Sequence, residues 1–231
     1  RGPIGRPRRD LIDVPSAGVW PINVWLLEHG DGWWLVDTGM AEDVCREAWL
    51  QLEEQTLGGR PLTRIFVTHD HPDHMGLAPW LAARHGAAVW MSEYAHRSAG
   101  EFLDTDPGVL ADRIRGFLHS HGVEVPPGVP PARGDHREWY GGLPPLAASP
   151  GDGDTIEAGG GRWQVVETGG HCRGHLCLYD AARRLLISGD QVLPSISPNV
   201  SVLSSAPEAD PLLGTQQALQ AEQSTILDLH Q

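Results

Sequence analysis

The sequence predicts a mixed α/β protein in which helices cover β-sheets. Short apolar runs, of which 64–68 and 163–167 are examples, alternate with stretches of helical periodicity in both halves of the chain. This alternation is typical of sheets packed under helices and unlike the pattern of a helix bundle. The 231 residues are 40% hydrophobic and 20% charged, a composition that can bury one core of two or more layers. We therefore expect residues 1–231 to form a single domain.

The first half of the chain should begin with a hairpin. Residues 22–28 and 33–36 are predicted strands, and the turn chemistry of His29-Gly30-Asp31-Gly32 joins them. Apolar periodicity then predicts a helix at about 42–55, and β-branched residues predict a strand around Ile65. The elements expected next are a helix that ends near 85, a strand at 87–91, and a helical stretch at 92–121 with a break near 106–108.

The second half should be richer in strands. Residues 126–150 contain many prolines and glycines, which predicts an irregular excursion. Together with the helical stretch before it, this region would be an insert at about 92–150. Strands are predicted at 163–167, 175–179 and 185–188, followed by a short helix around 212–221 and a strand that leads to His230.

The segment 68–74 carries three imidazoles and two carboxylates directly after an apolar strand. Histidine and aspartate are the side chains that bind borderline transition metals at neutral pH. Residues at i and i+2 of an extended loop point the same way, so His69 and His71 can converge on one ion. Pro72 then changes the direction of the chain, so Asp73 and His74 could face a second ion. Asp70 would turn outward. The alternatives are a solvated histidine-rich loop and a single structural metal.

Other predicted strands also end in candidate ligands. His171 follows the strand at 163–167, Asp190 follows the strand at 185–188, and Asp37 follows the strand at 33–36. Each residue alone is weak support for a metal site, because a histidine or aspartate after a strand is often structural. Taken together, these residues predict that the ends of several strands lie close together and place metal ligands at one site.

With these residues in view, the chain resembles the metallo-β-lactamase superfamily. The matching segments span roughly residues 20 to 200 and are Asp37-Thr38-Gly39, the His-x-His-x-Asp-His string of His69 to His74, Gly170-His171, and Ser188-Gly189-Asp190. The resemblance implies an α+β fold, a four-layer αββα sandwich with a binuclear metal centre between the sheet edges. It is strongest for the glyoxalase II-like branch of that family.

The resemblance also implies a role for each matching residue. One metal would be held by His69, His71 and His171, and the other by Asp73 and His74, with Asp190 bridging both. Asp37 would support the ligand loop through hydrogen bonds, or alternatively cap a turn. The family's last metal-binding histidine follows a Pro-x-His-Gly pattern, and no such segment follows Asp190. His230 is the remaining candidate; the alternative is a C-terminus that is truncated or divergent.

Charge, hydropathy and cysteine content limit the classes of partner and the compartment that we expect for this protein. A net charge of −13 repels phosphate backbones, which argues against nucleic acid. No apolar run approaches the roughly 20 residues that span a bilayer, which argues against a membrane partner. Cys45, Cys172 and Cys177 are too few and scattered for a disulfide framework, which favours the cytoplasm. We expect a small-molecule substrate; the oligomeric state is left open.

The resemblance implies a metal-dependent hydrolase of a small ester, thioester or lactone. Two divalent metal ions, with zinc favoured over iron or manganese, would supply a hydroxide. Asp73 and Asp190 would be the catalytic residues that position this hydroxide. The alternatives are a β-lactamase-type amide hydrolase, an iron-binding redox relative and a degenerate site. A nuclease of the same family is disfavoured by the acidic balance.

Overall fold

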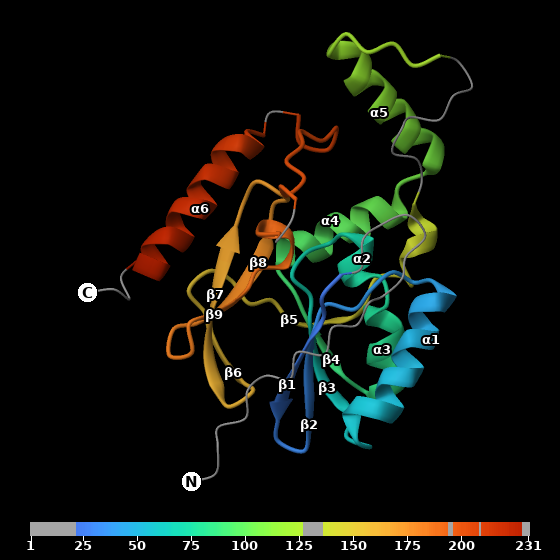
Figure 1. The fold of residues 1–231 in the computed structure, drawn as a ribbon. Coiled ribbons are helices and arrows are strands. Elements are labelled where there is room, and N and C mark those ends of the chain that lie inside the picture. The colour runs from blue at the N-terminus through green and yellow to red at the C-terminus, as the bar shows by residue number, and fades with distance from the viewer. Residues whose placement is uncertain (1–21, 127–135, 194–195, 208, 228–231) are drawn as a thin grey trace.

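Four layers make up the protein, in the order helices, sheet, sheet, helix (Figure 1). The structure is a computed structural model, and it describes residues 22–126, 136–193, 196–207 and 209–227. A five-stranded sheet and a four-stranded sheet form the two inner layers. Helices α1 and α3 cover the outer face of the first sheet, and α6 packs beside β7 of the second.

The first sheet has the strand order β1-β2-β3-β4-β5. An antiparallel hairpin begins it, in which His29 pairs with Gly32, and the later strands pair in parallel. The bounds are β1 Trp25–His29, β2 Gly32–Val36, β3 Leu62–Phe66, β4 Ala88–Trp90 and β5 Leu146–Ala148. Because β2 and β3 are parallel, their carboxyl ends meet at one edge, where the segments that carry Asp37 and His69 begin.

Five helices belong to the same half. They are α1 Asp43–Leu52, α2 Pro72–Met75, α3 Ala78–His85, α4 Glu93–Asp104 and α5 Pro107–Ser120. Helix α1 continues into a π-helical turn, Glu53–Leu57, that ends at Gly58 in the left-handed conformation. The core under these helices contains Trp49 of α1 and Leu81 of α3, both fully buried against the first sheet.

The second sheet is antiparallel throughout, in the order β6-β7-β8-β9. The strands are β6 Thr155–Ala158, β7 Gly161–Thr168, β8 His175–Asp180 and β9 Leu185–Ile187, and a 3₁₀ turn at Gly189–Gln191 follows. A second core fills the space between the sheets, with Trp34 and Phe66 on one side and Trp163 and Leu178 on the other. The carboxyl end of β7 and that of β9 lie near the ligand loop of the first sheet.

Several sequence predictions are confirmed. The hairpin and its turn form as expected, and the break at 106–108 divides α4 from α5. The cause of the break is local, because the Asp106 carboxylate accepts hydrogen bonds from the N–H groups of Gly108 and Val109, and Pro107 is compatible only with the first turn of a helix.

Other expectations were wrong. Strand β5 was not predicted because it lies in the proline- and glycine-rich stretch 126–150, and β6 was not predicted either. Helix α6, Pro211–Leu227, is longer than expected and includes residues 225–227, which were assigned to a strand. No glycine or proline interrupts 215–227, so nothing in the sequence ends the helix earlier. His230 lies outside the described residues.

Residues 92–150 contribute to the body of the molecule as well as to its surface. Ala95 and Ala99 of α4 are buried in the first core, and β5 extends the first sheet. Helix α5 differs, because none of its side chains is buried. Among the residues that the structure describes, no helix has the length and apolar character needed to cross a membrane.

Candidate metal centre

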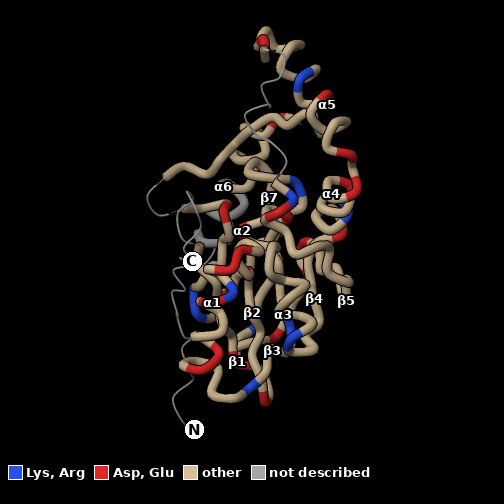
Figure 2. Tube along the Cα trace, turned by 90° about the vertical axis from the view of Figure 1, so that its right-hand side faces the viewer, with Lys and Arg blue, Asp and Glu red and all other residues tan. Residues whose placement is uncertain are grey.

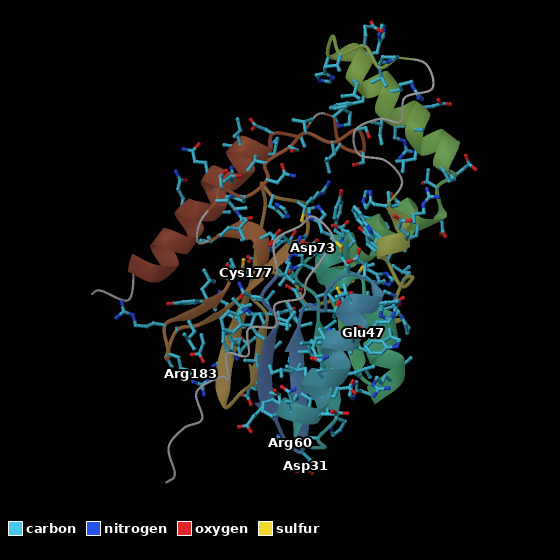
Figure 3. The ribbon with its side chains drawn as sticks, turned by 45° about the vertical axis from the view of Figure 1, so that its right-hand side comes forward. Asp31, Glu47, Arg60, Asp73, Cys177 and Arg183 are labelled. Atoms are coloured by element: carbon cyan, nitrogen blue, oxygen red, sulfur yellow. The ribbon has the colours of Figure 1, made fainter. Side chains whose placement is uncertain are left out.

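Three segments bring six of the predicted ligands together. The loop after β3 and the start of α2 carry His69, His71, Asp73 and His74, and the segments after β7 and β9 carry His171 and Asp190. Figure 3 shows Asp73 at the opposite end of the first sheet from Asp31 in the β1–β2 turn. The site therefore lies where the carboxyl ends of strands from both sheets meet, as is usual for ligand sites in such folds.

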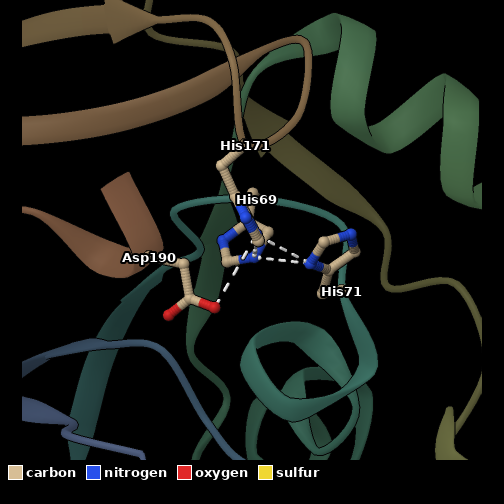
Figure 4. A group of neighbouring side chains, drawn as sticks. All are labelled: His69, His71, His171 and Asp190. Carbon is tan, nitrogen blue, oxygen red and sulfur yellow. Dashed lines mark hydrogen bonds and ion pairs between the residues drawn. The ribbon is translucent and has the colours of Figure 1, made fainter. Parts of the chain in front are cut away.

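Three imidazole nitrogens converge in the first ligand group. The Nε2 atom of His69 lies 3.0 Å from Nδ1 of His71, and Nε2 of His171 lies 3.2 Å and 2.9 Å from the same two atoms (Figure 4). The carboxylate of Asp190 is 3.7 Å from His171 Nε2. These four side chains each offer one ligand atom, all within 4.8 Å of one another. Such convergence is the geometry of a shared cation.

The second ligand group shares Asp190 with the first. It consists of Asp73, His74 and Asp190, with ligand atoms again within 4.8 Å of one another. Nε2 of His74 is buried and lies 3.1 Å from Asp190 Oδ1 and 3.5 Å from Asp73 Oδ2. The six predicted ligands thus form two adjacent groups joined by one carboxylate.

Hydrogen bonds behind the ligands set the orientation of three rings. Asp37 Oδ2 accepts a hydrogen bond of 2.8 Å from His74 Nδ1 and one of 2.9 Å from Thr68 Oγ1. Because the Thr68 hydroxyl donates to Asp37, it can accept from His69 Nδ1 at 2.9 Å. His171 Nδ1 donates to the carbonyl of Asn199 at 3.0 Å. In each neutral ring, the proton on Nδ1 leaves the lone pair of Nε2 free for a metal.

Burial and charge shift the pKa values in a consistent direction. Burial, with the neighbouring histidines adding to it, holds the pKa of His69 well below its ordinary value and lowers that of His71 to about 4. Burial also lowers the pKa of His171. These three rings are therefore neutral at pH 7, which is the protonation state that binds metal.

The carboxylates of the site are ionised. Burial would raise the pKa of Asp190, but the neighbouring His74 outweighs it and holds the pKa below its usual range. The pKa of Asp73 is lowered by His74 in the same way. Burial works against protonation of His74, yet the surrounding carboxylates of Asp73, Asp37 and Asp190 raise its pKa well above the ordinary value. A position that favours positive charge this strongly suits a cation.

The residues present fit a pair of borderline divalent ions. Imidazole and carboxylate donors suit zinc, iron and manganese. The Nε2 atom of His74 faces the Asp73 and Asp190 carboxylates, where a metal would replace the proton that the imidazole otherwise holds. Within the described part of the chain, neither ligand group contains a cysteine.

Some contributors were not singled out from the sequence. The Thr68 hydroxyl links Asp37 to His69, and its position between a strand and the first histidine is a signal that could have revealed it. The Asn199 carbonyl could not have been found from the sequence, because every residue has a backbone carbonyl group. Asp70 does turn away from both ligand groups, but it is only partly exposed and its carboxylate bonds Ser98 of α4. The His175 ring lies 4.8 Å from that of His69 and belongs to neither group.

A family model for the metallo-β-lactamase superfamily matches residues 17–227. The chain belongs to this superfamily. A solved β-lactamase domain protein from Burkholderia ambifaria is 31% identical, covers 90% of this chain and 62% of its own, and superimposes with a TM-score of 0.77. A metallo-β-lactamase family protein from Thermus thermophilus is 29% identical over 91% of this chain and 68% of its own, with a TM-score of 0.72. The predicted α+β sandwich is therefore confirmed.

The curated relatives of this chain are hydrolases by name. The chicken protein named acyl-coenzyme A thioesterase MBLAC2 is 29% identical over 74% of this chain and 57% of its own length. A hydroxyacylglutathione hydrolase from Ectopseudomonas mendocina is 28% identical over 78% of this chain and 51% of its own length. The atrochrysone carboxyl ACP thioesterase of Aspergillus fumigatus is 26% identical over 84% of this chain and 35% of its own length. The chain spans about half the length, or less, of the curated relatives it matches.

Proposed function

We propose that this chain is a metal-dependent hydrolase of a small thioester or ester, with a binuclear centre. The ligands would be His69, His71 and His171 for one ion and Asp73 and His74 for the other, bridged by Asp190. The observation that carries the proposal is the Asp190 carboxylate, which is common to both ligand groups. A carboxylate shared between three neutral imidazoles and the Asp73–His74 pair is suited to hold two ions side by side.

The residues of the site have separate tasks in this reaction. Divalent ions, when bound, activate a water as nucleophile and polarise the substrate carbonyl. The ionised Asp73 and Asp190 carboxylates would orient that water and accept its proton. Asp37 and Thr68 would keep His74 and His69 in the tautomer whose Nε2 faces the ions. Neither a serine nor a cysteine nucleophile is required.

The choice of substrate rests on two arguments. Two curated relatives are thioesterases by name and a third is named a hydroxyacylglutathione hydrolase, which favours a thioester over a lactone or a β-lactam. The net charge of −13 disfavours nucleic acid. Because Cys45, Cys172 and Cys177 form no disulfide, we propose a reducing compartment, the cytoplasm.

The proposal is tested by metal loading and a substrate panel. The chain is stripped with a chelator and reloaded separately with zinc, manganese or iron(II), and the metal per chain is counted by elemental analysis. We expect two ions per chain, as the two ligand groups require, and hydrolysis of a thioester. Asp190→Asn should lose about one ion and about 100-fold or more of kcat/KM. Asp43→Asn is the matched control, since that carboxylate is 94% exposed on α1.

Other outcomes would contradict this function. Cleavage of a β-lactam without cleavage of any thioester would indicate the amide hydrolase. Oxygen uptake by the iron-loaded protein would indicate a redox relative. A protein that binds no metal, or that stays inactive with every metal, would be a degenerate member of the fold.

A further inference from the structure

An uncharged stretch directly follows Asp190. Residues 191–207 contain no Asp, Glu, Lys, Arg or His, although 20% of the chain is charged. Four of their apolar side chains are exposed to solvent: Val192 by 43%, Ile196 by 59%, Val202 by 39% and Leu203 by 38%. We name these four residues the apolar strip. Single exposed apolar residues are common, but a group of them on one uncharged segment marks a binding surface.

The apolar strip is continuous with the candidate metal centre. Its segment begins at Asp190, the residue common to both ligand groups. The same segment returns to the centre at Asn199, whose carbonyl accepts the hydrogen bond from His171 Nδ1 at 3.0 Å. Asn199 lies between Ile196 and Val202 in the chain. The backbone of the segment is therefore anchored to a ligand of the centre at a position between these two apolar residues.

A second apolar surface occurs at the same end of the molecule. Leu110, Ile114 and Phe117 have the spacing of one helical face on α5, yet no side chain of this helix is buried and Val109 is 54% exposed. Figure 1 shows α5 and the segment 196–207 at the end of the molecule where α2 and the carboxyl ends of the first sheet's strands lie. Figure 2 shows charged residues on α4 and α5 at this end of the molecule.

We propose that the apolar strip binds the acyl chain of the substrate, so that the enzyme prefers thioesters of medium or long apolar acyl groups. This inference rests on the proposed function, because it places the acyl chain beside the scissile carbonyl. An uncharged strip offers no partner to a phosphate or carboxylate, whereas it lowers the free energy of a buried methylene chain. The occupant that fits is therefore the acyl group and not the carrier that leaves.

A chain-length series tests the preference. The zinc-loaded full chain is assayed with acetyl, butyryl, octanoyl and dodecanoyl thioesters of N-acetylcysteamine, which share one leaving group. We expect kcat/KM to rise about tenfold or more from acetyl to octanoyl, since each partly buried methylene adds to binding. Equal kcat/KM along the series would overturn the acyl-chain inference while leaving the proposed hydrolase intact.

A pair of surface variants assigns the effect to the strip. Ile196→Ser combined with Val202→Ser should lower the ratio of octanoyl to acetyl kcat/KM about threefold or more. Leu212→Ser is the matched control, because Leu212 is 73% exposed on α6 and lies outside the strip. The control should keep the wild-type ratio. Equal ratios in the double variant and the wild type would overturn the assignment.

A metal-independent measurement separates the two proposals. The dodecanoyl thioester of N-acetylcysteamine should bind the metal-stripped chain, which cannot hydrolyse it, in calorimetry, and the double serine variant should bind it more weakly than Leu212→Ser does. Binding without hydrolysis of any thioester would reject the proposed function but keep the apolar site. No binding would overturn the inference. So would self-association of the wild type that the double variant abolishes, because a second copy would then be the occupant.

Discussion

Asp37 combines an uncommon backbone conformation with several hydrogen bonds. Its φ of 62° lies in the left-handed region, which is uncommon for a residue other than glycine. Its carboxylate accepts bonds from His74 Nδ1, the Thr68 hydroxyl and the Thr68 N–H, the last at 2.8 Å. Residues held in such conformations cluster at functional sites, where surrounding contacts offset their strain. The geometry favours the supporting role over a simple turn cap.

Asp37→Asn should weaken metal binding about 10- to 100-fold. Asparagine tolerates the left-handed conformation, so the backbone can stay in place. Its amide group, however, can donate to His74 Nδ1, which would move the proton to Nε2 and remove the lone pair that faces the metal. Competition with a chromogenic chelator measures the affinity, and Asp43→Asn serves as control. Unchanged affinity would reject the supporting role.

Thr68→Val should destabilise the metal-free protein by about 1–3 kcal/mol, because it leaves the buried Asp37 and His69 without their shared partner. Thr68→Ser keeps the hydroxyl and should recover most of the loss. Urea unfolding at constant pH measures both. If serine were as destabilising as valine, the methyl group and not the hydrogen bonds would be the cause.

His71 should make the metal-free fold sensitive to acid. Its pKa falls from 6.5 to about 4, so between these values the unfolded chain takes up a proton and the folded chain does not. The stability of wild type relative to His71→Asn should therefore be constant above pH 6.5 and fall by about 1–3 kcal/mol as the pH drops to 4. Denaturant titrations across this range provide the measurement. A relative stability that rises toward low pH would contradict the assignment.

At the scale of elements, a close contact ties the His171 loop to the start of α6. Gly170 has φ +103, and a Cβ there would lie 2.6 Å from the backbone nitrogen of Thr215. Backbone atoms cannot move aside as a flexible side chain can. The loop that carries His171 can therefore reach the centre only with glycine at this position.

Gly170→Ala should lower stability by more than about 1 kcal/mol and reduce metal affinity, since the loop or α6 must shift. The matched control is Gly116→Ala on α5, where a Cβ meets nothing within 4 Å and helix propensity should stabilise by up to about 1 kcal/mol. Thermal unfolding and metal titration compare the two. Similar effects of the two substitutions would show that the contact is unimportant.

The predictability of elements follows their length and local chemistry. The hairpin turn at 29–32 and the break at 106–108 depend on residues adjacent in the chain, and both were predicted. Strands β5 and β6 form because neighbouring strands offer them hydrogen bonds, and a few residues do not encode that pairing. The apolar residues 225–227 suit a strand or a helix, and continuation of α6 decided the outcome.

At the scale of the whole molecule, the candidate centre joins the two halves. Four ligands come from the loop after β3 and α2 in the first half, and His171 and Asp190 come from the second sheet. A ligand that binds only the folded arrangement stabilises the whole protein by mass action. Metal should therefore stabilise both sheets together.

Each zinc ion that binds at about 100 times its dissociation constant should stabilise the chelator-stripped protein by about 2.7 kcal/mol. For a chain of this size, that corresponds to a rise in Tm of about 5–10 °C. Magnesium at the same concentration controls for ionic strength and should raise Tm less. Asp190→Asn should lose the part of the zinc effect that comes from the second ion. An identical Tm with and without zinc would mean that the two halves are not joined by metal.

The sequence by itself determined the ligand types, their order and the strands that precede them, because these depend on side-chain chemistry and on periodicity along neighbouring residues. It also determined the superfamily, through the segment from His69 to His74 and its partners His171 and Asp190. The resemblance already implied that Asp190 belongs to both ligand groups. Only the tertiary structure decided that Thr68 and Asn199 orient the imidazoles, and that the segment carrying the apolar strip contacts His171. These relations join residues that are far apart in the chain, and packing of the two sheets brings them together.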